Sequence, residues 1–260
     1  MKGTNRMIDT VVHLTSPRSA CPPMSFTLAV LSWGAHQTLE NTLNSYQKYG
    51  LDKLADQRVI FFQEISSEDM QIADKYNYEY LGSSTNLGIP GGYRALVSYA
   101  TQENFLFLEN DWELIEVPAR IIHHGQLWLL SPEIDVVRLR HRRYPGAPLW
   151  TLQFKGNELS RPEHLLDSVH WVDNPAQKFP QYIGYGEADD ENGKSEWFSA
   201  SSKHANWTNN PTMFRTDWLR KNIVDRLGDR DVELDIQSWW QQQFFGVTQG
   251  EGLFTHRRIG

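Results

Sequence analysis

The ten residues Asn104–Glu113 read N-F-L-F-L-E-N-D-W-E, and the rest of the chain can be interpreted around them. The run from Asn104 to Leu108 is rich in aromatic and branched apolar side chains, which is typical of a strand buried on both faces. It stops at Glu109, Asn110 and Asp111, and open α/β sheets usually bind their ligands where such strands end. Alternation along an extended chain points both carboxylates the same way, so they could share a divalent cation. The alternative is an acidic turn that only caps the strand.

Composition limits the class of protein and its surroundings. The chain has 260 residues, of which 40% are hydrophobic, enough for one large domain or one domain with an appendage. A formal net charge of −7 argues against a nucleic-acid-binding or anionic-membrane surface. The single cysteine, Cys21, excludes an intramolecular disulfide and suits a reducing compartment, so we expect a cytoplasmic protein. Residues 1–25 are polar and proline-containing, which indicates a flexible leader and no signal peptide, and no segment is apolar enough to span a bilayer.

In the first half, apolar runs alternate with stretches of helical spacing. This alternation predicts βαβ units and a mostly parallel sheet flanked by helices, that is, an α/β fold. The predicted strands are Phe26–Ser32, Arg58–Gln63, Tyr78–Leu81 and Asn104–Leu108, and the predicted helices are Thr38–Tyr49, a segment capped by Ser66 that ends near Asn77, and a segment that ends near Thr101.

The second half has a weaker pattern. Val117–Leu130 is predicted as a helix, Ile134–Leu139 as a strand, and two further helices are expected near Asp217–Leu227 and after Asp229. Gly184–Lys194 is glycine-rich and acidic, and we expect a mobile loop that closes over a ligand.

Two groups of basic residues have no clear role in this pattern. His123 and His124 are expected on a helix surface, because adjacent helical residues do not face one site. The arginine cluster could bind an anionic acceptor or a diphosphate, or form a solvated edge. Its members are Arg138, Arg140, Arg142 and Arg143.

Taken together, these motifs resemble a GT-A glycosyltransferase of the large family 2 type. Phe26–Ser32 and the following helix resemble the opening strand and helix of that family, and Val59–Ser66 resembles its V-V-D-D-G-S segment, with Gln63 and Glu64 in place of the two aspartates. The other matching segments follow in the family's order. They are Asn86-x-Gly88 with Arg94-Ala95 for N-x-G…R-N, Phe105–Asp111 for F-L-D-x-D, Arg230–Leu234 for E-D-V-E-L, and His256 for a C-terminal metal-binding histidine.

The resemblance implies a single GT-A (Rossmann-like) domain over residues 26–260. Residues 26–115 would bind the donor, a UDP- or GDP-sugar, and the loop-rich residues 116–260 would bind a glycan or another hydroxyl-bearing acceptor. It implies Mn²⁺ or Mg²⁺ on Asp111, Glu109 and His256. Asp231 would be the catalytic base of an inverting transfer, with Glu233 and Asp229 as rivals. The implied donor-binding residues are Ser32, Trp33, Glu64, Asn86, Arg94, Glu109, Asn110 and Asp111.

The chemistry of sugar transfer fits these residue types. A leaving diphosphate gains negative charge that a divalent cation neutralises, and the attacking hydroxyl must give its proton to a carboxylate. Two alternatives remain open at this point. One is a metal-dependent nucleotidyltransferase, although the chain lacks an early glycine-rich, lysine-containing phosphate loop. The other is a non-catalytic carbohydrate-binding protein with the same fold.

Overall fold

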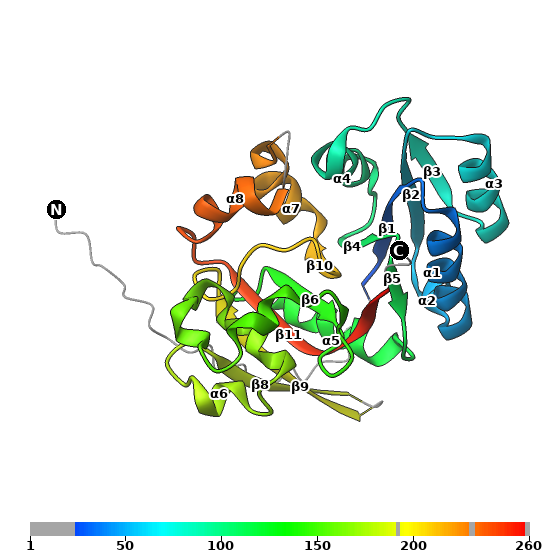
Figure 1. Cartoon of the computed structure of the whole chain (residues 1–260). Helices are drawn as coiled ribbons and strands as arrows, with labels where there is room; N and C mark the ends of the chain where they lie inside the picture. Colours follow the sequence, from blue (N-terminus) through cyan, green and yellow to red (C-terminus); the bar gives the residue numbers. More distant parts are fainter. Residues whose placement is uncertain (1–23, 191–192, 229–231, 258–260) are drawn as a thin grey trace.

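The computed structural model describes residues 24–190, 193–228 and 232–257, and within these ranges eleven strands form one sheet (Figure 1). Nine strands follow the order β3-β2-β1-β4-β10-β6-β11-β9-β8, while β5 and β7 pair with β11. The sheet is continuous from the predicted donor half into the predicted acceptor half. This mixed α/β architecture with flanking helices confirms the predicted fold class.

The first half has the predicted alternation of strands and helices, and its four strands pair in parallel with one another. The strands are β1 (Phe26–Trp33), β2 (Gln57–Gln63), β3 (Glu79–Gly82) and β4 (Asn104–Glu109). The helices are α1 (His36–Tyr49), α2 (Leu51–Leu54), α3 (Ser67–Tyr76) and α4 (Gly88–Tyr99).

Local sequence explains where these helices begin and end. The Ser66 side chain accepts a hydrogen bond from the amide of Asp69, and the Asp69 carboxylate accepts one from the amide of Ser66, so a capping box starts α3. Helix α1 ends at Gly50, whose φ of 83° is left-handed and whose amide donates to the carbonyl of Tyr46. These signals account for the agreement between predicted and observed helices in this half.

Two apolar layers cover the two faces of the sheet. Successive side chains of a strand point to opposite faces, so Leu28 and Val30 join one layer while Ala29 and Leu31 join the other. Figure 1 shows α1 and α3 on one face and α4 and α7 on the other. Because both faces are covered, β4 is buried from Asn104 to Leu108, and its carboxyl end opens at the sheet edge.

The second half adds antiparallel pairings and short helices. Strand β10 (Thr212–Arg215) runs antiparallel between β4 and β6 and joins the two halves of the sheet. The other strands are β5 (Trp112–Leu114), β6 (Val136–Arg140), β7 (Gly146–Ala147), β8 (Gly184–Asp190), β9 (Gly193–Ser201) and β11 (Gly246–Arg257). The α-helices are α5 (Ala119–Leu130), α6 (Pro175–Lys178), α7 (Thr216–Asn222) and α8 (Val232–Trp240). The 3₁₀ segments are η1 (Trp150–Phe154), η2 (Glu158–Ser160), η3 (Pro162–His170) and η4 (Val224–Arg226).

Strand β11 changes partners along its length. It pairs with β6 from Val247 to Gln249, and after a register shift its last residues pair with β5 and β7. Gly252 lies in the shift with a φ of 72°, and a Cβ there would lie 2.2 Å from the carbonyl oxygen of Arg140. Only glycine fits so close to a neighbouring backbone. The bend brings His256 opposite Trp112, next to the acidic turn after β4.

Two predictions for the second half are wrong. The expected mobile loop at Gly184–Lys194 is an antiparallel hairpin, because residues 184–190 and 193–194 pair in register between β8 and β9. His124 is fully buried on α5, where its Nδ1 lies 2.5 Å from the Ser195 hydroxyl and its Nε2 lies 3.4 Å from Asp190. The partly buried His123 lies 3.8 Å from the same Asp190 carboxylate.

The ends of the chain leave some predictions without a test. Residues 1–23 of the predicted leader are outside the described ranges, as is Asp231. Among the helices that the structure describes, none combines the length and the apolar character that a bilayer crossing requires. The cytoplasmic location remains a prediction.

Candidate functional site

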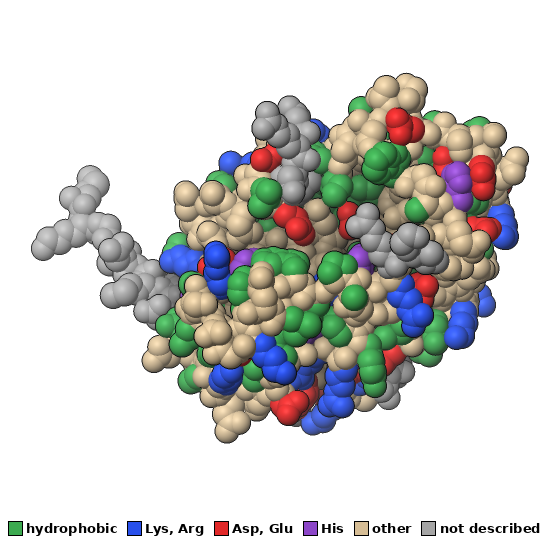
Figure 2. All heavy atoms as spheres, viewed as in Figure 1, with side chains coloured by type: hydrophobic (Ala, Val, Ile, Leu, Met, Phe, Trp, Pro, Cys, Tyr) green, Lys and Arg blue, Asp and Glu red, His purple; other side chains and the backbone are tan. Residues whose placement is uncertain are grey.

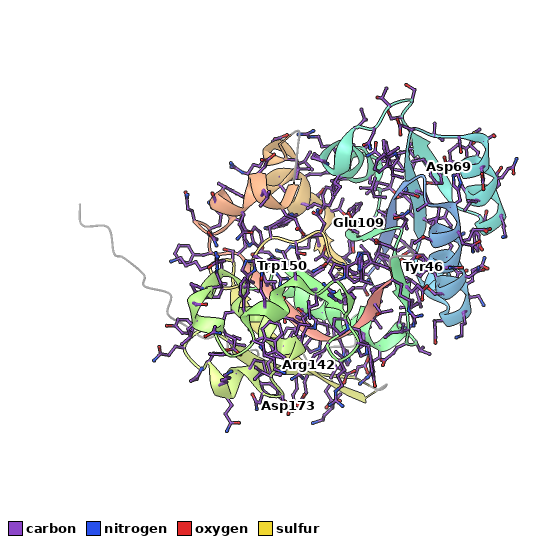
Figure 3. The ribbon with its side chains drawn as sticks, in the orientation of Figure 1. Tyr46, Asp69, Glu109, Arg142, Trp150 and Asp173 are labelled. Carbon is purple, nitrogen blue, oxygen red and sulfur yellow. The ribbon has the colours of Figure 1, made fainter. Side chains whose placement is uncertain are left out.

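The parallel strands β1, β2 and β4 end at the same edge of the sheet. Their registers place Leu31 opposite Glu109 and Trp33 opposite Gln63. The turns that follow carry most of the predicted donor-site residues, and Figure 3 shows Glu109 near the centre of the molecule at the end of β4. On the same view, Figure 2 shows a hollow over this edge. Such an edge is where α/β sheets bind ligands.

Trp33 and Glu64 form a pair at the ends of β1 and β2. The indole Nε1 of Trp33 donates to Oε2 of Glu64 over 2.8 Å, while the ring itself is 59% exposed. Glu64 has a φ of 52°, an uncommon conformation for a residue with a side chain. The pair therefore presents a fixed carboxylate and an exposed aromatic face at the predicted donor site.

Gln63 shapes the loop that contains Asn86. Its buried amide donates to the carbonyl of Gly88 over 2.6 Å and accepts from the amide of Leu87 over 2.8 Å. The Asn86 side chain accepts from the amide of Gly88 over 2.7 Å. Where the V-V-D-D-G-S motif has its first aspartate, this chain has Gln63, and Gln63 fixes the neighbouring loop.

Arg94 connects α4 with the end of η4. Its guanidinium donates to the carbonyl of Leu227 and, over 3.3 Å, to that of Gly228. The chain reaches the predicted base three residues after Gly228. The contacts described here hold the segment that leads towards the E-D-V-E-L-like motif. Donor binding by Arg94 stays a prediction.

The acidic turn after β4 is held by α1 and β1. The carbonyl of Asn110 accepts from the Thr42 hydroxyl over 2.7 Å, and its side-chain amide donates to the Ser32 hydroxyl over 3.3 Å. The side chains of Ser32 and Asn110 are therefore hydrogen-bonded to each other in this structure. Their shared contact fixes the position from which Asp111 projects.

Asp111 and His256 meet across the β5–β11 pairing. Nε2 of His256 lies 3.0 Å from Oδ2 of Asp111, and Nδ1 lies 2.6 Å from the carbonyl oxygen of Ala147. Burial lowers the pKa of His256, but the hydrogen bonds to Asp111 and Ala147 outweigh burial and raise it above its ordinary value. The second oxygen of Asp111, Oδ1, is buried and has no hydrogen-bond partner within the described ranges.

The Asp111–His256 pair has the donor types that a divalent cation requires. A buried carboxylate oxygen without a partner is costly unless something binds it, and carboxylate with imidazole suits Mn²⁺. In the described part of the chain, no cluster of three or more histidine, cysteine or acidic side chains has metal-site geometry. Two members of the predicted set, Asp111 and His256, are in contact. The third, Glu109, is the last residue of β4 and lies two residues before Asp111.

The predicted base region is only partly described. Asp231 lies outside the described residues, as does its rival Asp229. Glu233, at the start of α8, accepts a hydrogen bond from the amide of Asn209 over 2.8 Å. One of its carboxylate oxygens is therefore committed to the loop before β10.

The arginine cluster is not a solvated edge, because three of its four members bind protein groups. Arg138 is buried, donates to Asp167 over 2.8 Å and contacts Asn206. Arg140 donates to three backbone carbonyls of residues 145–148, and its charge lies 5.1 Å from the Trp112 ring. Arg142 donates to the carbonyls of Val169 and Val172. These side chains organise the second half around the site.

Arg140 and β11 are the parts of the site that the motif pattern did not reveal. Burial lowers the pKa of Arg140 to about 10, against the opposing effects of Asp167 and Glu233. The tilted rings of Trp112 and His256 lie 4.8 Å apart, so Arg140, Trp112 and His256 form one packed group behind Asp111. The available signal was an arginine within an apolar strand, since a buried arginine must find partners.

Known proteins resemble this chain in structure but not in sequence. No model of a known protein family matches the chain, and no curated protein matches it in sequence. Solved structures do match, including the mannosyltransferase PcManGT from Pyrobaculum calidifontis in complex with GDP-Man and Mn²⁺. It is 11% identical, with a TM-score of 0.51 over 85% of this chain and 52% of that chain.

Two further solved structures give the same picture. S. aureus TarS, residues 1–349, is 15% identical, with a TM-score of 0.55 over 90% of this chain and 60% of that chain. Glucosyl-3-phosphoglycerate synthase from Mycobacterium tuberculosis, in complex with Mn²⁺, UDP and glucosyl-3-phosphoglycerate, is 9% identical, with a TM-score of 0.51 over 91% and 73%. The chain spans about half to three fifths of the length of the first two proteins. At these identities the likeness concerns architecture alone, and that architecture is the predicted GT-A fold of glycosyltransferases.

Proposed function

We propose that this protein is a divalent-cation-dependent glycosyltransferase that moves a sugar from a UDP- or GDP-sugar to an acceptor hydroxyl with inversion. The observation that carries the proposal is the Asp111–His256 pair at the carboxyl end of β4, together with Oδ1 of Asp111, which has no hydrogen-bond partner among the described residues. The GT-A architecture supports it, because two of the three compared structures hold GDP-Man or UDP together with Mn²⁺.

Asp111 and His256 would hold the cation, with Glu109 as the further candidate ligand. When bound, the cation would neutralise the charge that develops on the leaving diphosphate. His256 must lose its Nε2 proton, or turn that nitrogen away from Asp111, before the nitrogen can coordinate a metal. Its second nitrogen stays on the carbonyl of Ala147, which fixes the ring plane.

The remaining residues would bind and orient the two substrates. The Trp33–Glu64 pair and the Asn86 loop would contact the nucleoside of the donor. Asp231 would take the proton of the attacking hydroxyl, and transfer in a single displacement would invert the anomeric carbon. Glu233 has one oxygen committed to Asn209, so we favour Asp231 over it as the base.

Calorimetry of UDP and GDP binding, with and without Mn²⁺, tests the metal site. Asp111→Asn should remove most of the Mn²⁺-dependent affinity, because it removes one negative charge and one strong ligand. Glu103→Gln is the matched control, since this exposed carboxylate precedes the opposite end of β4. Metal-dependent binding that survives in Asp111→Asn at parental strength would remove Asp111 from the site.

Hydrolysis of nucleotide sugars distinguishes an enzyme from a binding protein. We expect slow, Mn²⁺-dependent release of UDP or GDP without an acceptor. Once an acceptor is found, Asp231→Asn should slow transfer by roughly 10²–10⁴-fold and leave donor affinity intact, the usual range for general-base catalysis. A product with retained anomeric configuration would exclude the proposed single displacement.

A further inference from the structure

The segment Tyr144–Trp150 forms a fixed surface next to the Asp111–His256 pair. Arg140 donates to the carbonyl oxygens of Pro145, Gly146 and Pro148 over 2.9, 3.2 and 2.8 Å. At its start, Nδ1 of His141 accepts from the amides of Arg143 and Tyr144 over 3.1 and 2.9 Å. Strand β7 within the segment pairs with β11. The segment is therefore held from three sides, in a part of the chain that would otherwise be a free loop.

This fixed segment begins and ends with exposed aromatic rings. Tyr144 is 65% exposed and its ring lies 5.2 Å from that of His141. Trp150 is 48% exposed, and the rings of His164 and Phe154 stand almost perpendicular to it at 4.6 and 5.6 Å. Such packing fixes an aromatic ring without covering it. A ring held in place but left exposed offers a flat apolar face with little entropy left to lose on binding.

The aromatic segment is continuous with the candidate site. Ala147 lies between the two rings in sequence, and its carbonyl oxygen is the partner of His256, which contacts Asp111. Through Ala147, the segment that ends at Trp150 therefore joins the candidate donor site from the second half of the chain.

The charges around the segment favour a neutral occupant. Arg138, Arg140 and Arg142 are occupied by Asp167 and by backbone carbonyls, so their guanidinium groups are already used by the fold. Arg143 is the exposed member of the cluster. A neutral pyranose has apolar C–H faces that pack on aromatic rings and hydroxyl edges that stay in water. An anionic acceptor would instead have to be bound by Arg143, the one exposed member of the cluster.

We propose that Tyr144–Trp150 is an acceptor platform and that the acceptor is a neutral glycan, with one pyranose ring stacked on Trp150. This inference rests on the proposed function and names the substrate class of that function. It assigns Trp150 to acceptor binding and leaves donor binding to the β1, β2 and β4 ends. Arg143 has no part in it.

The test measures binding of maltotriose, mannotriose, N,N′,N″-triacetylchitotriose and 3-phosphoglycerate by saturation-transfer NMR with titration. Each is added to the full chain with Mn²⁺ and saturating UDP or GDP. The variants are Trp150→Ala, Trp150→Phe and Arg143→Gln, together with Tyr99→Ala. Tyr99 is a control ring that is 40% exposed, against 48% for Trp150, and it is the last residue of α4.

We expect at least one neutral trisaccharide to bind and Trp150→Ala to weaken it by about tenfold, the effect of losing one aromatic stacking contact of about 1.4 kcal/mol. Trp150→Phe should retain most of the affinity. Arg143→Gln and Tyr99→Ala should change nothing, and nucleotide affinity should be the same in every variant.

Two results would overturn the inference while leaving the proposed function intact. In one, the nucleotide binds but no neutral trisaccharide does, or Trp150→Ala leaves trisaccharide affinity unchanged. In the other, 3-phosphoglycerate binds and Arg143→Gln abolishes that binding. Absence of nucleotide binding in the parental protein would refute the proposed function itself, and the inference with it.

Discussion

Replacing Arg140 with methionine should both destabilise the protein and weaken metal binding at the proposed site. Arg140 is 4% exposed, and its guanidinium makes three hydrogen bonds to backbone carbonyls. Hydrogen bonds from a charged donor contribute roughly 1.5–3 kcal/mol each, so the three together contribute about 4–9 kcal/mol. Methionine has a similar apolar stem and no donor, so all three carbonyls lose their partner.

The cost of burying the charge opposes this gain. Burial lowers the Arg140 pKa from 12.5 to about 10, and each unit corresponds to about 1.4 kcal/mol, so removing the charge recovers roughly 3 kcal/mol. The hydrogen bonds are the larger effect. The difference between the two terms is the expected effect, so Arg140→Met should lower the free energy of unfolding by about 1–6 kcal/mol.

Urea unfolding followed by tryptophan fluorescence measures this loss as a lower transition midpoint at constant slope. Arg143→Met is the matched control, because the neighbouring arginine is exposed and should change stability by less than about 0.5 kcal/mol. Since the carbonyl of Ala147 would be less firmly held, Mn²⁺-dependent nucleotide affinity should also fall by roughly 10-fold, a usual effect of losing a partner of a metal ligand. A variant within 1 kcal/mol of the parental protein would refute the reasoning.

The remaining predictions concern pH, a backbone contact and a helix cap. Burial lowers the pKa of His170 from 6.5 to about 4, so the unfolded chain binds more protons than the folded chain between these pH values. The free energy of unfolding should therefore fall by up to about 3 kcal/mol from pH 6.5 to pH 4. Urea unfolding at several pH values measures this dependence, which His170→Gln should remove. Gly252→Ala should lower stability in thermal unfolding by more than about 3 kcal/mol, because the added Cβ would lie 2.2 Å from a carbonyl oxygen. Gly156→Ala is the control and should cost about 1 kcal/mol, because Gly156 also has a left-handed φ but no described atom lies within 4 Å of its Cβ position. Equal losses in the two variants would contradict the contact argument. Ser66→Ala should lower the unfolding free energy by about 1 kcal/mol and Ser67→Ala by much less, and similar values would place the cap elsewhere.

The first half was predictable because local and tertiary signals agree there. Buried strands read as apolar runs, and the helix after β1 carries Leu39, Leu43 and Tyr46 at helical spacing with Gly50 at its end. The sequence also placed the carboxylates of Glu64 and Asp111 at strand ends. Their roles in binding remain predictions.

The second half was harder because its order depends on contacts between distant residues. The glycine and acidic content of Gly184–Lys194 predicts a mobile loop. In the structure, Gly184, Gly186 and Ala188 of β8 are buried, while Tyr185 and Glu187 between them are exposed. That period of two indicates a strand, but the glycines and acids obscured it. Similarly, only the pairing of β11 with β5 explains why His256 meets Asp111 across 145 residues of sequence.

Arg140 gives a physical reason why the donor and acceptor proposals belong together. On one side its charge lies over the Trp112 ring, which packs against His256, and on the other it holds the carbonyls of the segment that ends at Trp150. A buried cation with a lowered pKa costs stability, but its three carbonyl hydrogen bonds more than offset that cost. The same contacts fix, from a single point, the loop whose Ala147 carbonyl contacts His256 and whose last residue is Trp150. The proposed metal ligand and the proposed acceptor platform are therefore both positioned by one side chain.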